Sequence, residues 1–504
     1  MNIRLLFTSD VHGFIFPRDY KDKEEKNLGL CKLSSLIREK RDENTILIDL
    51  GDYIQGSLLA DYVYEKNDRK YFAQIQNYCG YDIGVLGNHD FNYGKDYLKD
   101  HIRNCDHRFL SANIKEEGRD FLKEYEIIEK NGIKIALIGL TTPYIKNWEL
   151  EENIKGLSFE SAFSKTKELV GKLKDKADLV VLAYHGGFEK DLKTGEILDK
   201  NIGENEGYKI LKNIEGIDVI LTGHQHREIA ENIGNTSLVQ AGYGGEFLGC
   251  VDIEFDKDKK IIEKTPRLFD LKFVDQDEKI VEKFSFMEDK MSSWLNEDLV
   301  KADDLKILDT DKARFDGHPY PNLVNKIQLH YSGADISSTS LFLMDSPGLS
   351  GRVKRRDVLR NYPYNNTLAV IDVSGRELKE ALIENSMYFL NKNGQVVVNE
   401  DYIYPKNKCY NYDFYYGIEY VIDLNKPKEE RLVSLKYKGK DVKDNDKFSL
   451  ATNQYRALGG GGFWMFKGKE IKKSIKTPIN RLIISYLKGL KYLKRDEKRY
   501  FKYV

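Results

Sequence analysis

The chain has 504 residues, which suits two or three domains, and its 80 Lys and Arg balance 81 Asp and Glu to a net charge of −1. That balance provides no basic field for holding long nucleic acid, and no stretch approaches the roughly 20 apolar residues of a membrane span. The opening residues, MNIRLLFTSDVHG, are too poor in apolar residues for a secretory signal, so we expect a cytoplasmic protein, or a periplasmic or cell-surface one if the chain is a trimmed mature form.

Short apolar runs alternate with amphipathic stretches in the first half of the chain. The predicted strands are Ile3–Thr8, Thr45–Leu50, Ile83–Leu86, Ile133–Leu140, Leu179–Ala183 and Asp218–Leu221. Helical periodicity between several of them marks Leu30–Lys40, Phe159–Lys174 and Gly207–Ile214. This alternation of strand and helix predicts an α/β domain built in layers.

Polar residues follow most of the predicted strands. They stand as Asp10 and His12, Gly51-Asp52, Gly87-Asn88-His89-Asp90, His185, and Gly223-His224-Gln225-His226. Ligands of open α/β sheets bind beyond the carboxyl ends of the strands. We therefore expect these side chains to converge on one site.

The pattern of the sequence changes after about residue 270. Asp277–Leu295 has the pattern of one amphipathic helix, and Lys301–Lys312 is charged and poorly patterned. We predict a first domain over residues 1–275, a linker helix over 276–300 and a smaller α+β domain over 301–504. The predicted elements of the last domain are helices Pro321–Tyr331, Gly375–Leu390 and Pro478–Leu487 and strands Thr367–Val373, Ile418–Leu424 and Lys447–Thr452.

Histidine is concentrated in the motifs at the strand ends. Five of the nine histidines stand there: His12, His89, His185, His224 and His226. Imidazole beside carboxylate and carboxamide groups suits Mn, Fe, Co, Ni or Zn better than Mg or Ca. None of the five cysteines belongs to these motifs, which argues against a structural zinc site. The remaining histidines are expected to be ordinary structural residues: His101, His107, His318 and His330.

The motifs D-x-H, G-D, G-N-H-D, H and G-H-x-H resemble those of the calcineurin-like metallophosphoesterases, and all five occur in that family's order. The resemblance implies a four-layer α/β/β/α domain and two divalent transition-metal ions, which would be Mn, Zn, Co or Fe. It implies that one ion is held by Asp10, His12 and His226, the other by Asn88, His185 and His224, and that Asp52 bridges them. His89 would then be a general acid or a stabiliser of the transition state.

The second half of the chain resembles the C-terminal domain of 5'-nucleotidases, which binds the nucleoside in that family. The matching segments are Gly333–Ser337, Tyr362–Leu368, Val373–Leu378, Tyr410–Asp413, Gly417–Asp423 and Asn453–Gly461. Tyrosine rings stack on nucleobases with roughly 1–3 kcal/mol per base. We expect Tyr412 or its neighbour Tyr410 to form a base clamp with Tyr455, with Arg456 as a further substrate-binding residue.

Asn92 occupies the place where 5'-nucleotidases of the family carry an aspartate beside the histidine of G-N-H-D. This feature resembles the branch of 2',3'-cyclic-nucleotide 2'-phosphodiesterases/3'-nucleotidases. The resemblance implies hydrolysis of those nucleotides by attack of a metal-bridging hydroxide on phosphorus. Because the aspartate is absent, we expect Asp90 or the backbone to orient His89.

Three other functions stay open at this point. A 5'-nucleotidase or nucleotide-sugar hydrolase would use the same fold and metals. A nucleotide- or metal-binding module without catalysis is disfavoured because no ligand of the family's set is missing. A metallonuclease on long DNA or RNA is disfavoured by the near-neutral charge. A small-molecule nucleotide is the expected partner, and the sequence does not indicate an oligomeric state.

Overall fold

The computed structural model describes residues 1–20, 24–198, 203–403 and 407–504. The chain forms two compact units, Met1–Met291 and Ser292–Val504, and the boundary falls within helix α7 (Glu278–Leu295). Among the described residues, no helix is long and apolar enough to cross a membrane.

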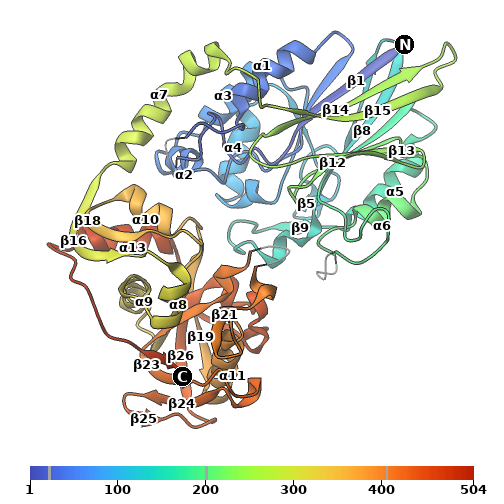
Figure 1. The fold of residues 1–504 in the computed structure, drawn as a ribbon. Coiled ribbons are helices and arrows are strands. Elements are labelled where there is room, and N and C mark those ends of the chain that lie inside the picture. The colour runs from blue at the N-terminus through green and yellow to red at the C-terminus, as the bar shows by residue number, and fades with distance from the viewer. Residues whose placement is uncertain (21–23, 199–202, 404–406) are drawn as a thin grey trace. The chain divides into compact units, whose positions relative to one another are not determined.

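Unit 1, residues Met1–Met291, contains two six-stranded sheets (Figure 1). The first has the order β15-β14-β1-β2-β3-β4, in which β1 to β4 are parallel. The second has the order β12-β13-β11-β10-β8-β7, in which the four central strands are parallel. The strands of the first sheet are β1 (Asn2–Thr8), β2 (Thr45–Asp49), β3 (Ile83–Val85), β4 (Arg108–Leu110), β14 (Phe247–Phe255) and β15 (Ile261–Asp270). Those of the second are β7 (Tyr125–Lys130), β8 (Ile133–Thr141), β10 (Leu179–His185), β11 (Val219–Thr222), β12 (Glu228–Ile233) and β13 (Thr236–Ala241).

Helices cover the outer faces of the two sheets, which confirms the expected α/β/β/α layers (Figure 1). Side chains such as Leu5, Ile48 and Val181 form the core between the sheets. A second core lies between the second sheet and its helices. The helices of unit 1 are α1 (Leu30–Lys40), α2 (Leu58–Glu65), α3 (Tyr71–Cys79), α4 (Lys95–Asn104), α5 (Ala162–Leu173) and α6 (Gly207–Asn213). Because the central strands are buried on both faces, they are continuous apolar runs in the sequence.

Unit 2, residues Ser292–Val504, has a five-stranded sheet of order β22-β17-β26-β19-β27 and a four-stranded sheet of order β25-β24-β23-β28. The strands are β17 (Ile336–Ser340), β19 (Thr367–Ser374), β22 (Asp413–Tyr416), β23 (Ile418–Ile422), β24 (Leu432–Tyr437), β25 (Lys440–Asp441), β26 (Lys447–Asn453), β27 (Ile471–Pro478) and β28 (Phe501–Tyr503). The helices are α8 (Thr310–Asp316), α9 (Pro319–Ser332), α10 (Arg355–Asn361), α11 (Gly375–Ser386), α12 (Gln454–Ala457) and α13 (Ile479–Lys488).

Two segments of unit 2 differ from the sequence-based expectation. The stretch that begins at Lys301 is not irregular, because strand β16 (Asp298–Lys306) pairs there with β18 (Gly348–Lys354). Two register shifts interrupt this pair, which explains why the sequence lacks a clear alternation. Helix α11 ends at Ser386 and not at Leu390, because Phe389–Lys392 turns back as strand β20 against β21 (Gln395–Val398).

Candidate functional site

The ends of five strands of unit 1, with the loops that follow them, bring polar side chains together at one edge of both sheets. The seven residues of this strand-end cluster are Asp10 and His12 after β1, Asp52 after β2, Asn88 after β3, His185 at the end of β10, and His224 and His226 after β11. The clustering follows from the parallel central strands, whose carboxyl ends share an edge of each sheet.

The backbone of the strand-end cluster is bent in a way that ordinary loops avoid. Left-handed φ angles between 51° and 67° occur at Asp10, His12, Asp52, His224 and His226. Such conformations cost roughly 1–3 kcal/mol each and gather at functional sites. Gly87 makes the close approach possible, because a Cβ there would lie 2.1 Å from Asp52 Oδ1.

One group of potential ligands contains Asp10, His12 and His226, whose ligand atoms lie within 4.8 Å of one another. His12 Nδ1 donates to Gln55 O at 2.8 Å, which leaves Nε2 directed at the cluster. His226 Nε2 lies 3.4 Å from His12 Nε2 and 3.4 Å from Asp10 Oδ1. These three residues could therefore share one ion.

A second group contains Asp10, Asp52 and His185. His185 Nδ1 donates to Leu50 O at 2.8 Å, and its Nε2 lies 3.2 Å from Asp52 Oδ2. Both of these facing atoms are buried and have no hydrogen-bond partner among the described residues. Buried polar atoms are normally paired, so the donor set fits a divalent cation as the missing partner.

Asn88 and His224 extend the second group. Asn88 Oδ1 lies 2.8 Å from His224 Nδ1. The other ring nitrogen, His224 Nε2, lies 3.1 Å from Glu204 Oε1, and the ring of Trp148 is centred 5.4 Å from the imidazole. Sequence reasoning missed Glu204 and Trp148, because each stands in a loop without a motif of its own.

The buried carboxylates dominate the electrostatics of the strand-end cluster. Burial disfavours the charged imidazole of His185, but the charges of Asp52 and Asp10 outweigh that effect and raise its pKa to about 10. Burial alone would raise the pKa of Asp52, yet His185 and the other imidazoles hold it well below its usual value. Two ionised carboxylates in a buried pocket favour the binding of positive charge.

His89 lies beside the cluster at the start of the short helix η1 (His89–Phe91). Its backbone N–H donates to Asp52 Oδ1 at 2.7 Å, and its ring Nδ1 lies 2.7 Å from Asn92 Oδ1. The ring is thus paired with the side chain of Asn92 and not with Asp90 or the backbone, the two partners expected from the sequence. The carboxylate of Asp90 is occupied by four backbone N–H groups, those of Asp52, Tyr53, Ile54 and Gly87, at 2.8–3.2 Å. Asp90 therefore stabilises the loops that carry the cluster.

The tyrosines expected to bind the base differ in exposure. Tyr455 is 49% exposed, and its ring covers Gly460, where a Cβ would meet ring carbons within 2.7 Å. Burial, and then the charge of the Tyr455 phenol, raise the pKa of Tyr410. Tyr412 does not fit the expectation, because it is 0% exposed and its hydroxyl donates to Arg314 O at 2.7 Å. Of the three tyrosines, Tyr410 and Tyr455 therefore stay candidates for the expected base clamp.

Arg456 also differs from the expectation of direct substrate contact, because it is 1% exposed. Its guanidinium forms a bidentate pair with Asp413 at 2.9 and 3.0 Å. It also donates to Gly460 O at 2.6 Å and to Tyr410 O at 3.0 Å. Arg456 thus holds the segment that carries Tyr410 against the glycine loop below Tyr455.

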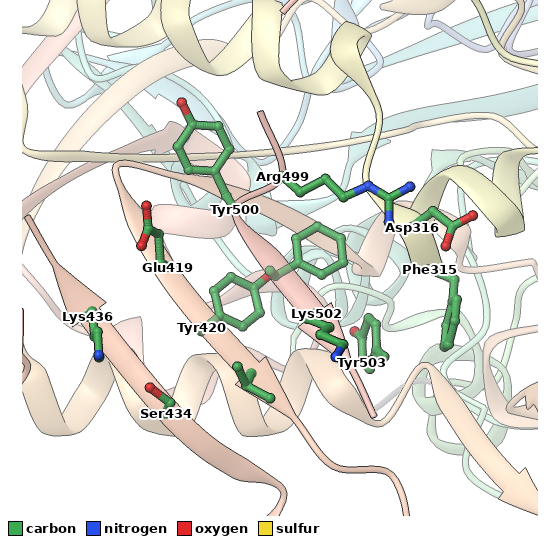
Figure 2. A pocket seen from close by; sticks show the side chains of 12 residues that line it. Phe315, Asp316, Glu419, Tyr420, Ser434, Lys436, Arg499, Tyr500, Lys502 and Tyr503 are labelled. Atoms are coloured by element: carbon green, nitrogen blue, oxygen red, sulfur yellow. The ribbon is translucent and has the colours of Figure 1, made fainter. Parts of the chain in front are cut away.

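A separate hollow of about 530 Å³ lies in unit 2 against strands β23, β24 and β28. Figure 2 shows the rings of Tyr420, Tyr500 and Tyr503 and the charged ends of Arg499 and Lys502 around it. None of the residues expected to bind metal or substrate lines this hollow. The size of a cavity therefore does not locate the candidate site, whose identification rests on side-chain chemistry.

Comparison with known proteins identifies the class of this fold and cluster. Residues 3–228 match the calcineurin-like phosphoesterases and residues 300–468 match the 5'-nucleotidase C-terminal domain. The chain belongs to this family of phosphoesterases with a 5'-nucleotidase C-terminal domain and is a phosphoric ester hydrolase. The fold of this family implies a divalent-metal site with Asp and His ligands.

Individual relatives carry several names. A crystal structure of a putative 5'-nucleotidase from Staphylococcus aureus, in complex with alpha-ketoglutarate, is 34% identical over 100% of both chains with a TM-score of 0.90. The 2',3'-cyclic-nucleotide 2'-phosphodiesterase/3'-nucleotidase of Salmonella typhimurium is 27% identical over 91% of this chain and 82% of its own. The trifunctional nucleotide phosphoesterase YfkN of Bacillus subtilis is 24% identical over 97% of this chain, which spans only 38% of that relative.

Proposed function

We propose that the protein hydrolyses nucleoside 2',3'-cyclic phosphates and 3'-nucleotides. The observation that carries the proposal is the strand-end cluster, in which Asp52 Oδ2 and His185 Nε2 are buried and have no hydrogen-bond partner among the described residues. Relatives from Salmonella typhimurium, Haemophilus influenzae and Yersinia enterocolitica that bear this activity in their names are 26–27% identical over 91% of the chain. Asn92 in place of an aspartate supports the same branch.

Two divalent cations would supply Lewis-acid activation of water and neutralisation of the phosphate charge. Asp10, His12 and His226 would hold one, Asn88, His185 and His224 the other, and Asp52 both. His89 would approach the phosphate from its free ring nitrogen and stabilise charge or give a proton to the leaving oxygen. Tyr410 and Tyr455 would stack on the base.

A 5'-nucleotidase is the alternative, and relatives from Vibrio vulnificus and Vibrio parahaemolyticus carry that name at 25–26% identity over 75% of the chain. The test is a steady-state comparison of 2',3'-cAMP, 3'-AMP, 5'-AMP, ADP and UDP-glucose with Mn, Co and Zn. We expect kcat/KM to be highest for 2',3'-cAMP and 3'-AMP. A higher value for 5'-AMP or UDP-glucose would establish the alternative instead.

A further variant tests the place of His89 in this chemistry. His89→Ala should retain its metal content and lose kcat by roughly 10²–10⁴, the usual contribution of an acid–base group. Loss of metal together with activity would instead make His89 a ligand.

A further inference from the structure

His89 is connected to a carboxylate that neither the motif nor the cluster contains. Its Nδ1 lies 2.7 Å from Asn92 Oδ1, and Asn92 Nδ2 donates to Glu149 Oε2 at 2.5 Å. Glu149 stands in the turn after the short helix η2 (Pro143–Asn147), far from His89 in the sequence. The three side chains form one hydrogen-bonded series, the His89–Asn92–Glu149 chain.

The chemistry of each group fixes the direction of each hydrogen bond. An ionised carboxylate can only accept, so Asn92 must present its NH₂ group to Glu149. The amide oxygen of Asn92 therefore faces His89, and because that oxygen can only accept, His89 Nδ1 must carry a proton. Nε2 is then the ring nitrogen left for the substrate, and it can give a proton there only when His89 is the doubly protonated imidazolium.

Glu149 is itself held in place by amide groups. Its Oε1 accepts from Leu150 N at 2.8 Å and from Asn153 Nδ2 at 2.7 Å. Asn153 Nδ2 also donates to Asn92 O at 3.1 Å, so Asn153 ties the two loops together. Among the described residues, no Lys or Arg forms an ion pair with Glu149, so its full charge acts on these amide donors.

We propose that Glu149 is the positioning carboxylate for His89 and acts through the amide of Asn92. The inference rests on the proposed function, in which His89 acts on the substrate. In a direct His–Asp pair, one carboxylate fixes the orientation and the tautomer of the ring. In the His89–Asn92–Glu149 chain, the amide contacts the ring and the carboxylate fixes the amide. An amide does not take up a proton at neutral pH, so the His89–Asn92–Glu149 chain orients the His89 ring and does not carry its proton away.

Exchanging the carboxylate and the amide between positions 92 and 149 tests the proposal. Glu149→Gln should lower the activity of the parent protein but raise that of Asn92→Asp. In Glu149→Gln, either end of the new amide can face Asn92, so the orientation of Asn92 is no longer enforced, and we expect kcat to fall about tenfold or more with little change in KM. In Asn92→Asp, two carboxylates adjoin and repel, and activity should fall as well. The double variant Asn92→Asp/Glu149→Gln restores one carboxylate and one amide donor, so it should be at least about tenfold more active than Asn92→Asp.

The matched control is Glu151→Gln, which removes a charge from an exposed neighbour in the same turn. Its kcat should stay within about twofold of the parent, because Glu151 has no part in the chain. If Glu149→Gln and Asn92→Asp impair the enzyme additively and the double variant is the worst of the three, the proposal is overturned.

A second measurement does not depend on activity. Nitrogen-15 NMR of histidine-labelled protein, with His89→Gln for assignment, should show the Nδ1–H tautomer for His89 in the parent and a mixture in Glu149→Gln. An Nε2–H tautomer in the parent contradicts the proposal, and so does loss of metal in Glu149→Gln at an unchanged tautomer. If His89→Ala has full activity, the proposed function of His89 fails, while the NMR result still decides whether Glu149 orients the ring.

Discussion

At the scale of the residue, three histidines of the strand-end cluster have the same hydrogen-bonding arrangement. One ring nitrogen of each is held by a fixed partner, and the other faces the cluster. Backbone oxygens hold His12 and His185, whereas the carboxylate of Glu204 faces His224. A partner of this kind selects the tautomer and raises the basicity of a metal-binding imidazole, and a carboxylate does so more strongly than a carbonyl.

Glu204 should therefore contribute to metal affinity although it is not in the cluster. We expect Glu204→Gln to weaken the binding of Mn or Zn by about 10- to 100-fold, the usual effect of such a partner. Competition with a chromogenic chelator would measure the affinity. Glu189→Gln is the control, because Glu189 lies in the same connection but accepts from the N–H groups of Tyr208 and Lys209. Equal losses in both variants would show that the loop as a whole, and not the contact with His224, sets the affinity.

His101 and His107, which we expected to be structural, predict the response of unit 1 to acid. Burial, and then the charge of His107, lower the pKa of His101 to about 3, and burial lowers the pKa of His107 to about 4. Both are neutral in the folded protein, whereas the unfolded chain binds protons below about pH 6.5. Stability is thus complete above about pH 6.5 and falls as the pH drops from there toward 4, with a limiting slope of about 1.4 kcal/mol per pH unit for each histidine.

Replacing one of these histidines should make the free energy of unfolding fall less steeply as the pH drops below 6.5. His107 is suited to the test, because neither of its ring nitrogens has a hydrogen-bond partner in the part of the chain that the structure describes, and its ring centroid lies 4.7 Å from that of Phe109. His107→Phe should keep its stability at pH 7 and lose less than the parent between pH 6.5 and 4 in urea unfolding. The exposed His330→Phe should follow the parent curve. Parallel curves for His107→Phe and the parent would mean that His107 is protonated in the folded state.

At the scale of the element, hydrophobic periodicity and the turn residues between apolar runs predict the strands and where they end. The strands that precede the cluster are continuous apolar runs, so their ends, and with them the seven cluster residues, could be found. The sequence could not decide which of Tyr410 and Tyr412 is exposed enough to bind a base, because the pattern of an aromatic segment does not show which of its residues is buried. The structure buries Tyr412, whose hydroxyl finds partners in Arg314 and Tyr503. The acceptor role of Asp90 and the contacts of Glu149 and Glu204 depend on loops distant in sequence, which periodicity does not place.

The last turn of α7 is held within unit 2 by a stacked indole. Trp294 is 9% exposed, and the guanidinium carbons of Arg355 and Arg481 lie 4.4 and 4.9 Å from its ring centroid. Arg355 begins α10 and Arg481 belongs to α13, so one side chain joins three helices. Trp294→Leu should lower the free energy of unfolding of this unit by about 1–3 kcal/mol through lost stacking and packing.

Thermal and urea unfolding would measure the effect of Trp294→Leu. The control is Trp464→Leu, since Trp464 is 61% exposed and its replacement should change stability by less than about 0.5 kcal/mol. An equal loss in both variants would indicate a general cost of removing indole, and no loss in Trp294→Leu would remove the stacked indole as an anchor of α7.

At the scale of the whole molecule, the two units divide the residues of the proposed function. The strand-end cluster and His89 belong to Met1–Met291, and the clamp tyrosines belong to Ser292–Val504. Stacking acts on the base and chemistry acts on phosphorus. Binding energy from the base is largely common to the ground and transition states, so its loss should appear mainly in KM. A part should appear in kcat, because remote binding energy also positions the reacting group.

Tyr455→Ala tests this division of labour. For a nucleotide substrate, we expect a loss of roughly 5- to 150-fold in kcat/KM, the equivalent of about 1–3 kcal/mol of stacking. For bis-p-nitrophenyl phosphate, which has no nucleobase, kcat/KM should stay within about twofold. Tyr492→Ala is the control, because Tyr492 is similarly exposed, at 46%, but is engaged with Asp303. Equal damage to both substrates would mean that Tyr455 supports the fold of its loop, and no damage to either would mean that the base binds elsewhere. Only a loss of kcat/KM that is confined to the nucleotide supports the base clamp. It would mean that stacking adds binding energy to a phosphoesterase centre that hydrolyses other substrates without it.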